Sequence, residues 1–450
     1  MRSLRLLAPL AVLLLLGACS LDINDPLTAL TGPSMPKTGG LAVGDEPFAV
    51  HIGASVLASG GDAADAATAM YFALAVTYPV AAGLGGGGLC VVHDSKTGRN
   101  EQFDFLARDA GGGAYAIPGN VRGFAQLQAA YGSLSWQRVV APAESLAGGG
   151  FTISRALAVR LAAAQNIIRL DADMAAEFMD ESGQVKKAGM NVSDADLAAT
   201  LAAIRINGAE AFYRGAVGAK LIAYSEAQGG AITPAQLAAY AVLRSQARAM
   251  QVGNQSVYLP AARTGAGAFA GAFVEALNRE GLGAEPQAAT VAAVRQALAQ
   301  FGVKNLPQDL GATGFAAIDA QGQAVSCAVT MNGPFGSGHT AAGTGVTLAR
   351  APSGEMGLAS AFLTPVISID SSGAVSLAGA GAGGPNGTAA IGYALLRTAS
   401  GEPLTRRGDM RSTGSAPYDT VNVIACSSGA CFALPDPGAS GMGAAAANGQ

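Results

Sequence analysis

Four pairs of short apolar runs, each pair separated by a turn rich in Asp, Ser and Gly, constrain the fold of this chain most strongly. The pairs are residues 89–92 with 101–105, 315–318 with 324–329, 366–369 with 374–377, and 421–425 with 432–434. Apolar runs of strand length around such turns are typical of β-hairpins. We therefore predict antiparallel sheet.

Two long tracts, 56–75 and 153–247, instead place Leu and Ala at helical spacing. Within the second tract, Ser193, Asp194 and Asp196 precede an apolar run and predict a capped helix start. Hairpins combined with long helices indicate a mixed α and β fold that needs no βαβ alternation.

Composition excludes several classes of protein. Of 450 residues, 62 are glycine, 50% are hydrophobic and only 13% are charged, so the chain can bury a large core and is not disordered by charge. The glycines cluster and do not recur at every third position, which excludes collagen. With 27 basic and 31 acidic residues and no basic stretch, the chain is not expected to bind nucleic acid.

The N-terminus predicts export. Arg2 and Arg5 precede an apolar run, 6–16, that is too short to span a bilayer and ends just before Cys19. This pattern resembles a bacterial lipoprotein signal, in which Cys19 is lipidated; an ordinary signal peptide cut near Ala18 is the alternative. Both predict a cell-envelope protein, periplasmic or anchored to the outer membrane, that touches the membrane only through the lipid. We expect a signal peptide at 1–18, a flexible tether at 19–40 and a flexible tail at 437–450.

The cysteines and histidines bear on whether the chain forms disulfides or binds a metal. An oxidising compartment permits disulfides, and the last predicted hairpin brings Cys426 opposite Cys431. A disulfide between them and two free thiols both remain open. The three histidines, His51, His93 and His339, show no metal-binding spacing, so we predict no metal and no other cofactor.

Two glycine-rich loops carry the G-x-G-x-x-G pattern. The first, 83–88, follows a helix and precedes a strand, the reverse of the order that dinucleotide binding requires. The second, 379–384, follows a strand and precedes the helix-like run 388–396. Its backbone amides are placed to bind an anion or a developing oxyanion, and a tight turn that needs only backbone freedom is the alternative.

Several motifs occur in the order found in the γ-glutamyltransferase (γ-glutamyltranspeptidase) family, and the chain resembles that family along most of its length. They are Ser59 to Ala67, Pro79 with 83–88, Ile117 to Gly123, Tyr131-Gly132, Trp136, Leu197 to Leu201, Gly208, Phe212 to Gly215, Gly229-Gly230 with Thr233, Asp319 to Asn332 and Phe335 to Gly338. The resemblance implies an N-terminal nucleophile hydrolase-like four-layer αββα sandwich. It also implies a large-subunit-like region, 41–311, and a small-subunit-like region, 312–436.

In that family the precursor cleaves itself and exposes a threonine, whose hydroxyl attacks a γ-glutamyl carbonyl. The corresponding residue here, without gaps, is Ala312, and Thr313 follows it. Family residues near the site match Thr330 and Asn332, and the oxyanion glycines match Gly383 and Gly384. The arginine that binds the substrate carboxylate falls on Leu106, or on Arg108 if one gap is inserted.

The family's serine pair falls on Ala361 and Phe362, and its segment rich in Asn and Asp is replaced by Leu348 to Pro352. Most groups for a glutamyl α-amino acid are therefore missing. His339 follows a matched motif, but the resemblance assigns it no role.

Three hypotheses follow. The first is an exported enzyme that hydrolyses or transfers γ-glutamyl or related amides, with glutathione-type substrates and with Thr313 as the nucleophile after a one-residue shift. The second is a non-cleaving pseudoenzyme of the same fold that binds a peptide or amino-acid ligand or an envelope partner. The third, a structural surface lipoprotein without a cleft, explains the composition but not the ordered motifs.

Overall fold

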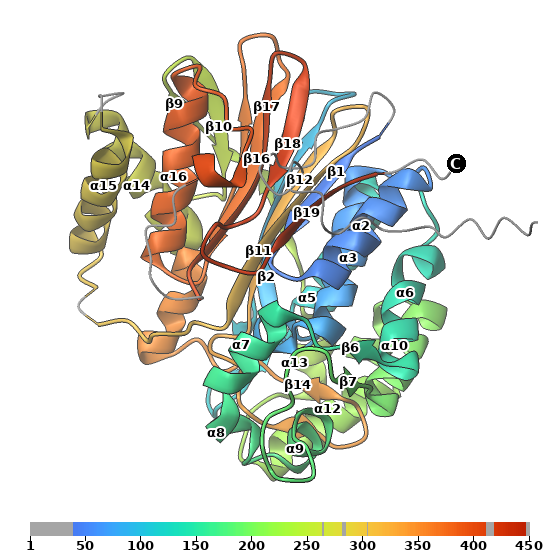
Figure 1. The fold of residues 1–450 in the computed structure, drawn as a ribbon. Helices are drawn as coiled ribbons and strands as arrows, with labels where there is room; N and C mark the ends of the chain where they lie inside the picture. The colour runs from blue at the N-terminus through green and yellow to red at the C-terminus, as the bar shows by residue number, and fades with distance from the viewer. Residues whose placement is uncertain (1–38, 263–264, 281–284, 304, 411–417, 447–450) are drawn as a thin grey trace, which may run out of the picture.

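Two antiparallel sheets, stacked face to face, form the centre of the molecule (Figure 1). The computed structural model describes residues 39–262, 265–280, 285–303, 305–410 and 418–446. One sheet has seven strands in the order β19-β1-β11-β12-β2-β3-β8, and the other has six in the order β18-β17-β16-β15-β10-β9. Strands β11 and β12 lie against β16 of the other sheet.

The strand bounds confirm all four predicted hairpins, which are β2 with β3, β11 with β12, β15 with β16, and β17 with β18. The strands of the two large sheets are β1 (Leu41–Gly44), β2 (Gly87–Asp94), β3 (Arg99–Phe105), β8 (Leu243–Gln246), β9 (Arg248–Val252), β10 (Gln255–Leu259), β11 (Ala312–Ile318), β12 (Ala324–Thr330), β15 (Thr364–Ile369), β16 (Val375–Ala382), β17 (Thr420–Ser427), β18 (Ala430–Leu434) and β19 (Met442–Ala445). Short pairs complete the set: β4 (Arg108–Asp109) with β5 (Ala116–Ile117), β6 (Phe151–Thr152) with β7 (Asn191–Val192), and β13 (Thr340–Ala341) with β14 (Val346–Thr347).

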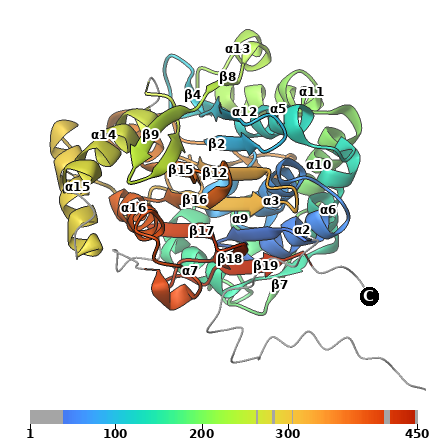
Figure 2. The same cartoon turned by 90° about the horizontal axis from the view of Figure 1, so that it is seen from above.

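Helices cover the outer face of each sheet, which gives four layers (Figure 2). On the seven-stranded sheet lie α2 (Pro47–Ala58), α3 (Ala63–Thr77) and α5 (Asn120–Tyr131). On the six-stranded sheet lie α14 (Gly265–Glu280) and α16 (Pro385–Ala399), and α15 (Pro286–Gln300) packs on these two helices. Apolar clusters fill both helix–sheet layers and the space between the sheets. The predicted αββα sandwich is therefore confirmed.

Small side chains allow α3 to pack closely on the sheet, and all of its residues are buried. The helix starts at Asp62 in a capping box with Asp65, whose carboxylate also accepts hydrogen bonds from the Ser133 and Leu134 amides at 2.9 and 3.0 Å. A left-handed Gly60 (φ +86°) separates α3 from α2. The helical tract predicted at 56–75 is thus two helices.

The second helical tract is a series of short helices. They are α7 (Arg155–Ala163), α8 (Gln165–Ile168), α9 (Ala172–Phe178), α10 (Ala195–Asn207), α11 (Glu210–Tyr213), α12 (Ala216–Ala227) and α13 (Pro234–Ala239). Outside this tract lie α4 (Pro79–Ala82), α6 (Trp136–Gly149) and the 3₁₀ helices η1 (Gly354–Phe362) and η2 (Arg407–Asp409). The predicted helix start is confirmed at α10, where the Asp194 side chain accepts from the Leu197 amide at 2.9 Å.

One boundary prediction is wrong, and others lie beyond what the structure describes. The tail predicted at 437–450 is not flexible throughout, because Met442–Ala445 forms β19 and pairs with β1. The signal at 1–18, Cys19 and nearly all of the tether at 19–40 lie outside the described residues. In the described ranges, no helix is both long enough and apolar enough to cross a bilayer.

Two disulfides lie between directly paired strands. Cys90 of β2 is joined to Cys327 of β12, and Cys426 of β17 is joined to Cys431 of β18. Disulfides of this kind persist in oxidising compartments.

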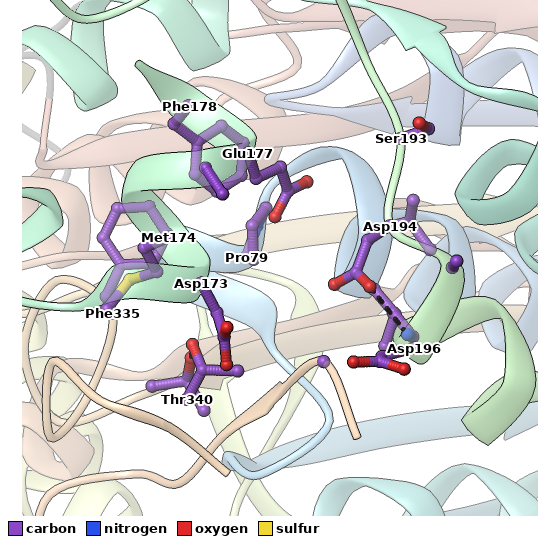
Figure 3. A pocket seen from close by; sticks show the side chains of 16 residues that line it. Pro79, Asp173, Met174, Glu177, Phe178, Ser193, Asp194, Asp196, Phe335 and Thr340 are labelled. Carbon is purple, nitrogen blue, oxygen red and sulfur yellow. Dashed lines mark hydrogen bonds between the residues drawn. The ribbon is translucent and has the colours of Figure 1, made fainter. Parts of the chain in front are cut away.

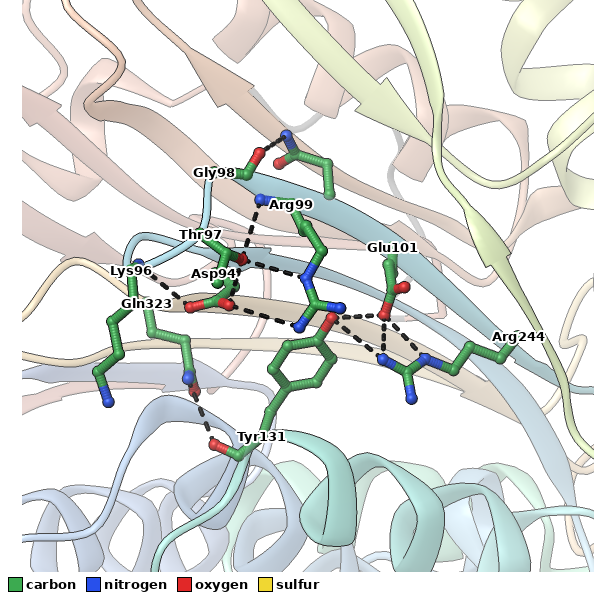
Figure 4. A network of polar contacts seen from close by, with 10 residues as sticks. Asp94, Lys96, Thr97, Gly98, Arg99, Glu101, Tyr131, Arg244 and Gln323 are labelled. Atoms are coloured by element: carbon green, nitrogen blue, oxygen red, sulfur yellow. Dashed lines mark hydrogen bonds and ion pairs between the residues drawn. The ribbon is translucent and has the colours of Figure 1, made fainter.

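A polar network ties α5 to the edge of the seven-stranded sheet (Figure 4). Glu101 of β3 accepts hydrogen bonds from the Tyr131 hydroxyl and from Arg244 of β8, whose Nε lies 2.8 Å away. Burial, together with the Glu101 carboxylate, raises the pKa of Tyr131 to about 12. The network fixes β8, whose first residue, Leu243, lines a cavity described below.

Candidate functional site

The residue at the nucleophile position, Ala312, lies in an apolar cluster. It is the first residue of β11, and its side chain is 1% exposed. Its neighbours come from both sheets and from α14, namely Leu89, Ala266, Ala328, Leu363, Ala380 and Ala382, and Leu106 packs against them. The cluster contains no group that can attack a carbonyl.

The carbonyl group before Ala312 nevertheless retains hydrogen-bond donors. The Gly311 carbonyl oxygen accepts from the Met331 amide at 2.8 Å and from Thr330 Oγ1 at 3.1 Å. Thr330 Oγ1 also lies 3.0 Å from the Leu310 carbonyl and accepts from the Asn332 amide at 2.9 Å. Thr330 therefore lies beside the peptide bond that self-cleavage would break, and the Asn332 amide hydrogen-bonds to its hydroxyl.

Thr313 lies in different surroundings from Ala312. It is fully buried, and its hydroxyl donates to Asp45 Oδ2 at 2.6 Å. Thr420 Oγ1 donates to the same carboxylate at 2.8 Å, and so does Asn422 Nδ2. Side chains alternate along a strand, so Thr313 is directed away from the Ala312 cluster. Its predicted role as the nucleophile remains a prediction.

The predicted oxyanion glycines form the turn between β16 and α16. Gly383 has a left-handed backbone (φ +90°), and a Cβ there would overlap the Tyr418 carbonyl oxygen, so only glycine fits. A Cβ on Gly384 would lie 2.6 Å from both oxygens of Asp419. The Asp419 carboxylate accepts from the Asn386 amide at 3.3 Å, and burial raises its pKa to about 6. A carboxylate of this chain thus lies against the start of α16.

Arg108 and Asn332 meet at a cavity of about 320 Å³. The Arg108 guanidinium lies 5.5 Å from the Tyr240 ring centroid, and Nη2 lies 3.5 Å from the Ala241 carbonyl oxygen. Leu106 both lines this cavity and packs against the Ala312 cluster. Its side chain therefore separates the cavity from Ala312, which is not among the lining residues.

A buried ion pair that sequence reasoning missed holds the segment before Ala312. Arg160 of α7 is 1% exposed, and its Nη2 lies 2.7 Å from Asp309 Oδ1. The same oxygen accepts from the Gly311 amide at 2.8 Å. The only sequence signal was a charged residue within an apolar helical tract. Asp45 and Asp419 were missed as well, because their partners are distant in sequence.

His339 lies at the surface, beside Asp171. The His339 side chain is 45% exposed, and Nδ1 lies 3.9 Å from Asp171 Oδ2. Among the residues that the structure describes, no group of three or more His, Cys, Asp or Glu side chains is arranged to hold a metal ion.

Comparison with known proteins identifies one family. The γ-glutamyltranspeptidase family model matches residues 49–299 and 284–355. Glutathione hydrolase 3 of Arabidopsis thaliana is 32% identical over 236 residues, which is 49% of this chain and 37% of that protein. Glutathione hydrolase proenzyme of Escherichia coli is 32% identical over 45% of this chain and 38% of its own, and acylase ACY 1 proenzyme of a Pseudomonas species is 32% identical over 50% and 46%. The matches therefore span less than half of these relatives.

Solved structures agree on the fold. Cephalosporin acylase from Bacillus halodurans superposes with a TM-score of 0.72 at 17% identity, covering 90% of this chain and 96% of that one. γ-Glutamyltranspeptidase from Helicobacter pylori gives a TM-score of 0.52 at 28% identity, covering 57% and 81%.

Proposed function

This chain belongs to the γ-glutamyltranspeptidase family, and we propose that it is an exported member that does not cleave itself and that binds a small γ-glutamyl or peptide ligand. The observation that carries the proposal is Ala312. Acyl transfer in this fold needs an N-terminal nucleophile, and the side chain at that position is a methyl group packed among other apolar side chains.

The surroundings of Thr313 also favour a binding function. To act as the nucleophile, Thr313 would have to become the first residue of a new chain and turn its hydroxyl toward the cavity. It lies instead within β11, paired with Val329, and donates to the buried Asp45 carboxylate. Changing this arrangement would break a charge-assisted hydrogen bond as well as strand pairing.

The cavity at Arg108 supports a carboxylate-bearing ligand. A guanidinium binds carboxylates well because its donors match the two oxygens. A volume of about 320 Å³ is at the small end of ligand pockets. An amino acid or short peptide matches both the charge and the size.

Export is supported by the N-terminal pattern and by the two disulfides. Lipidation at Cys19 is part of the proposal, and mass analysis of the mature N-terminus tests it. An N-terminus at Ser20 or an unmodified Cys19 would contradict lipid anchoring without affecting the binding function.

Gel electrophoresis under denaturing conditions and intact mass measurement test the absence of cleavage. We expect a single chain that continues through residues 311–313. Two fragments, with Thr313 at the new N-terminus, would overturn the proposal and support the enzyme.

Calorimetric titration with glutathione tests the ligand site. We expect Arg108→Gln to weaken binding about tenfold or more, because it removes a charge-assisted contact. Arg138→Gln is the matched control, since Arg138 is exposed and does not line the cavity. Equal binding by the parent and Arg108→Gln would place the ligand elsewhere.

A further inference from the structure

A second cavity, of about 310 Å³, lies between α9, the start of α10 and the loops around β13 and β14 (Figure 3). It shares no lining residue with the cavity at Arg108. Four carboxylates line it, those of Asp173, Glu177, Asp194 and Asp196, and none of its lining residues is basic. Part of its wall is apolar, formed by Met174, Phe178 and Phe335 among others.

The central carboxylate of this cavity, that of Glu177, makes no direct ion pair, although the charge of the nearby Lys186 partly offsets the rise of its pKa. Glu177 is partly exposed as a residue, yet its carboxyl end points into the cavity and is shielded from water. It makes no hydrogen bond or ion pair with any residue that the structure describes. The nearby Lys186 donates to the Glu177 backbone carbonyl at 2.6 Å, not to the carboxylate.

The carboxylates also repel one another. Burial, followed by the charge of Asp194, raises the pKa of Glu177 well above its ordinary value. Burial also raises the pKa values of Asp194 and Asp173, and neighbouring acidic groups add to both. A cation placed among these groups would relieve the repulsion.

The shape of the cavity favours an organic cation over a metal ion. In the described part of the chain, these oxygens do not converge as a metal-binding cluster, and Ca²⁺ needs six to eight oxygen ligands. The rings of Phe178 and Phe335, with centroids 5.8 Å apart, offer surfaces for methylene groups and for an ammonium.

We propose that this acidic cavity binds a small aliphatic polyamine, with ammonium groups at the carboxylates and methylene groups against the phenylalanines. Glu177 and Asp194, which enter the cavity from α9 and from the start of α10, would hold the inner ammonium. Asp173 and Asp196 would contact the outer one. The site is separate from the cavity at Arg108 and does not depend on the proposed function.

Calorimetric titration of the full chain with spermidine, at constant ionic strength and near neutral pH, tests this proposal. We expect saturable binding to one site. Glu177→Gln keeps the shape of the side chain and removes its charge, so it should weaken binding about tenfold or more. Asp173→Asn, on the exposed side of α9, is a second variant that folding should tolerate.

Glu181→Gln is the matched control, because Glu181 is exposed, carries the same charge and does not line the cavity. An equal loss in this control would show general attraction by surface charge and would overturn the proposal. Absence of saturable heat would also overturn it, as would binding of Ca²⁺ that spermidine does not displace. Circular dichroism verifies that each variant is folded, and titration of Glu177→Gln with glutathione verifies that the cavity at Arg108 is unaffected.

Discussion

Replacing Ala312 with threonine is expected to start self-cleavage between residues 311 and 312. The introduced hydroxyl would lie next to the Gly311 carbonyl carbon and could attack it, with its proton passing to the departing nitrogen. The C–N bond breaks, an ester forms, and water then releases a chain that begins at residue 312. The negative charge of the tetrahedral intermediate develops on the Gly311 oxygen, which already accepts from the Met331 amide and Thr330 Oγ1.

The structure sets the scale of two effects, the acceleration of self-cleavage and the loss of folding stability. Loss of one oxyanion donor typically slows acyl transfer by about 10²- to 10³-fold, so Thr330→Val in the Ala312→Thr background should slow cleavage by roughly that factor. Stability is lost because the new side chain enters an apolar cluster in which Ala312 is 1% exposed. Overpacking costs about 1–3 kcal/mol, and an unpaired buried hydroxyl costs about 1–3 kcal/mol more.

Ala312→Val is the matched control, because valine has nearly the shape of threonine without the hydroxyl. Samples taken over hours, separated under denaturing conditions and analysed by mass, should show fragments only for the threonine variant. Urea unfolding should show a similar overpacking loss in both. A threonine variant that is folded and stays intact would refute the reasoning that the donors at Gly311 still act as an oxyanion hole.

Three further changes have defined outcomes. Thr313→Val should lower the free energy of unfolding by about 1–3 kcal/mol in urea titrations, because it removes a donor from the buried Asp45. Glutathione binding should be unchanged. Loss of acyl-transfer activity in this variant would instead identify Thr313 as a nucleophile. Burial raises the pKa of Glu46 to about 7 in the folded protein. Between the ordinary pKa of a glutamate and about pH 7, the free energy of unfolding therefore falls as the pH rises, because the unfolded chain ionises first. Glu46→Gln should therefore be more stable than the parent at about pH 8, by on the order of 3 kcal/mol, and lose this advantage near pH 4, as thermal unfolding at both pH values would detect. Replacing Cys90 and Cys327 with alanine should cost about 5.5 kcal/mol, because that disulfide joins residues 237 positions apart in the sequence, and an unchanged urea midpoint would contradict this.

Local patterns in the sequence predicted the parts of the fold that local chemistry determines. The four hairpins follow from turn residues and apolar runs, and the α10 start follows from Asp194. The edge strand β19 was missed because Met442–Ala445 has no strand pattern of its own and pairs with a strand about 400 positions earlier. Pairing over such a distance depends on tertiary structure.

The candidate site was predicted only in part, for the same reason. The absence of a nucleophile at Ala312 could be read from the aligned residues. The apolar cluster around it, the Asp419 carboxylate at the start of α16 and the Arg160–Asp309 ion pair each join segments that are distant in sequence. No residue pattern along the chain signals these contacts.

Restoring the nucleophile should therefore restore self-cleavage without restoring turnover of a γ-glutamyl amide. Self-cleavage uses donors at Gly311, which are present, whereas an acyl substrate would need the glycine turn as its oxyanion donor. There Asp419, with a pKa of about 6, is ionised near neutral pH and lies against Gly384, so a second negative charge would be repelled. Leu106 also closes the path from the Arg108 cavity to residue 312. We expect Ala312→Thr to cleave itself yet release no product from a chromogenic γ-glutamyl anilide; steady product release by that single variant would show that neither Asp419 nor Leu106 blocks the site.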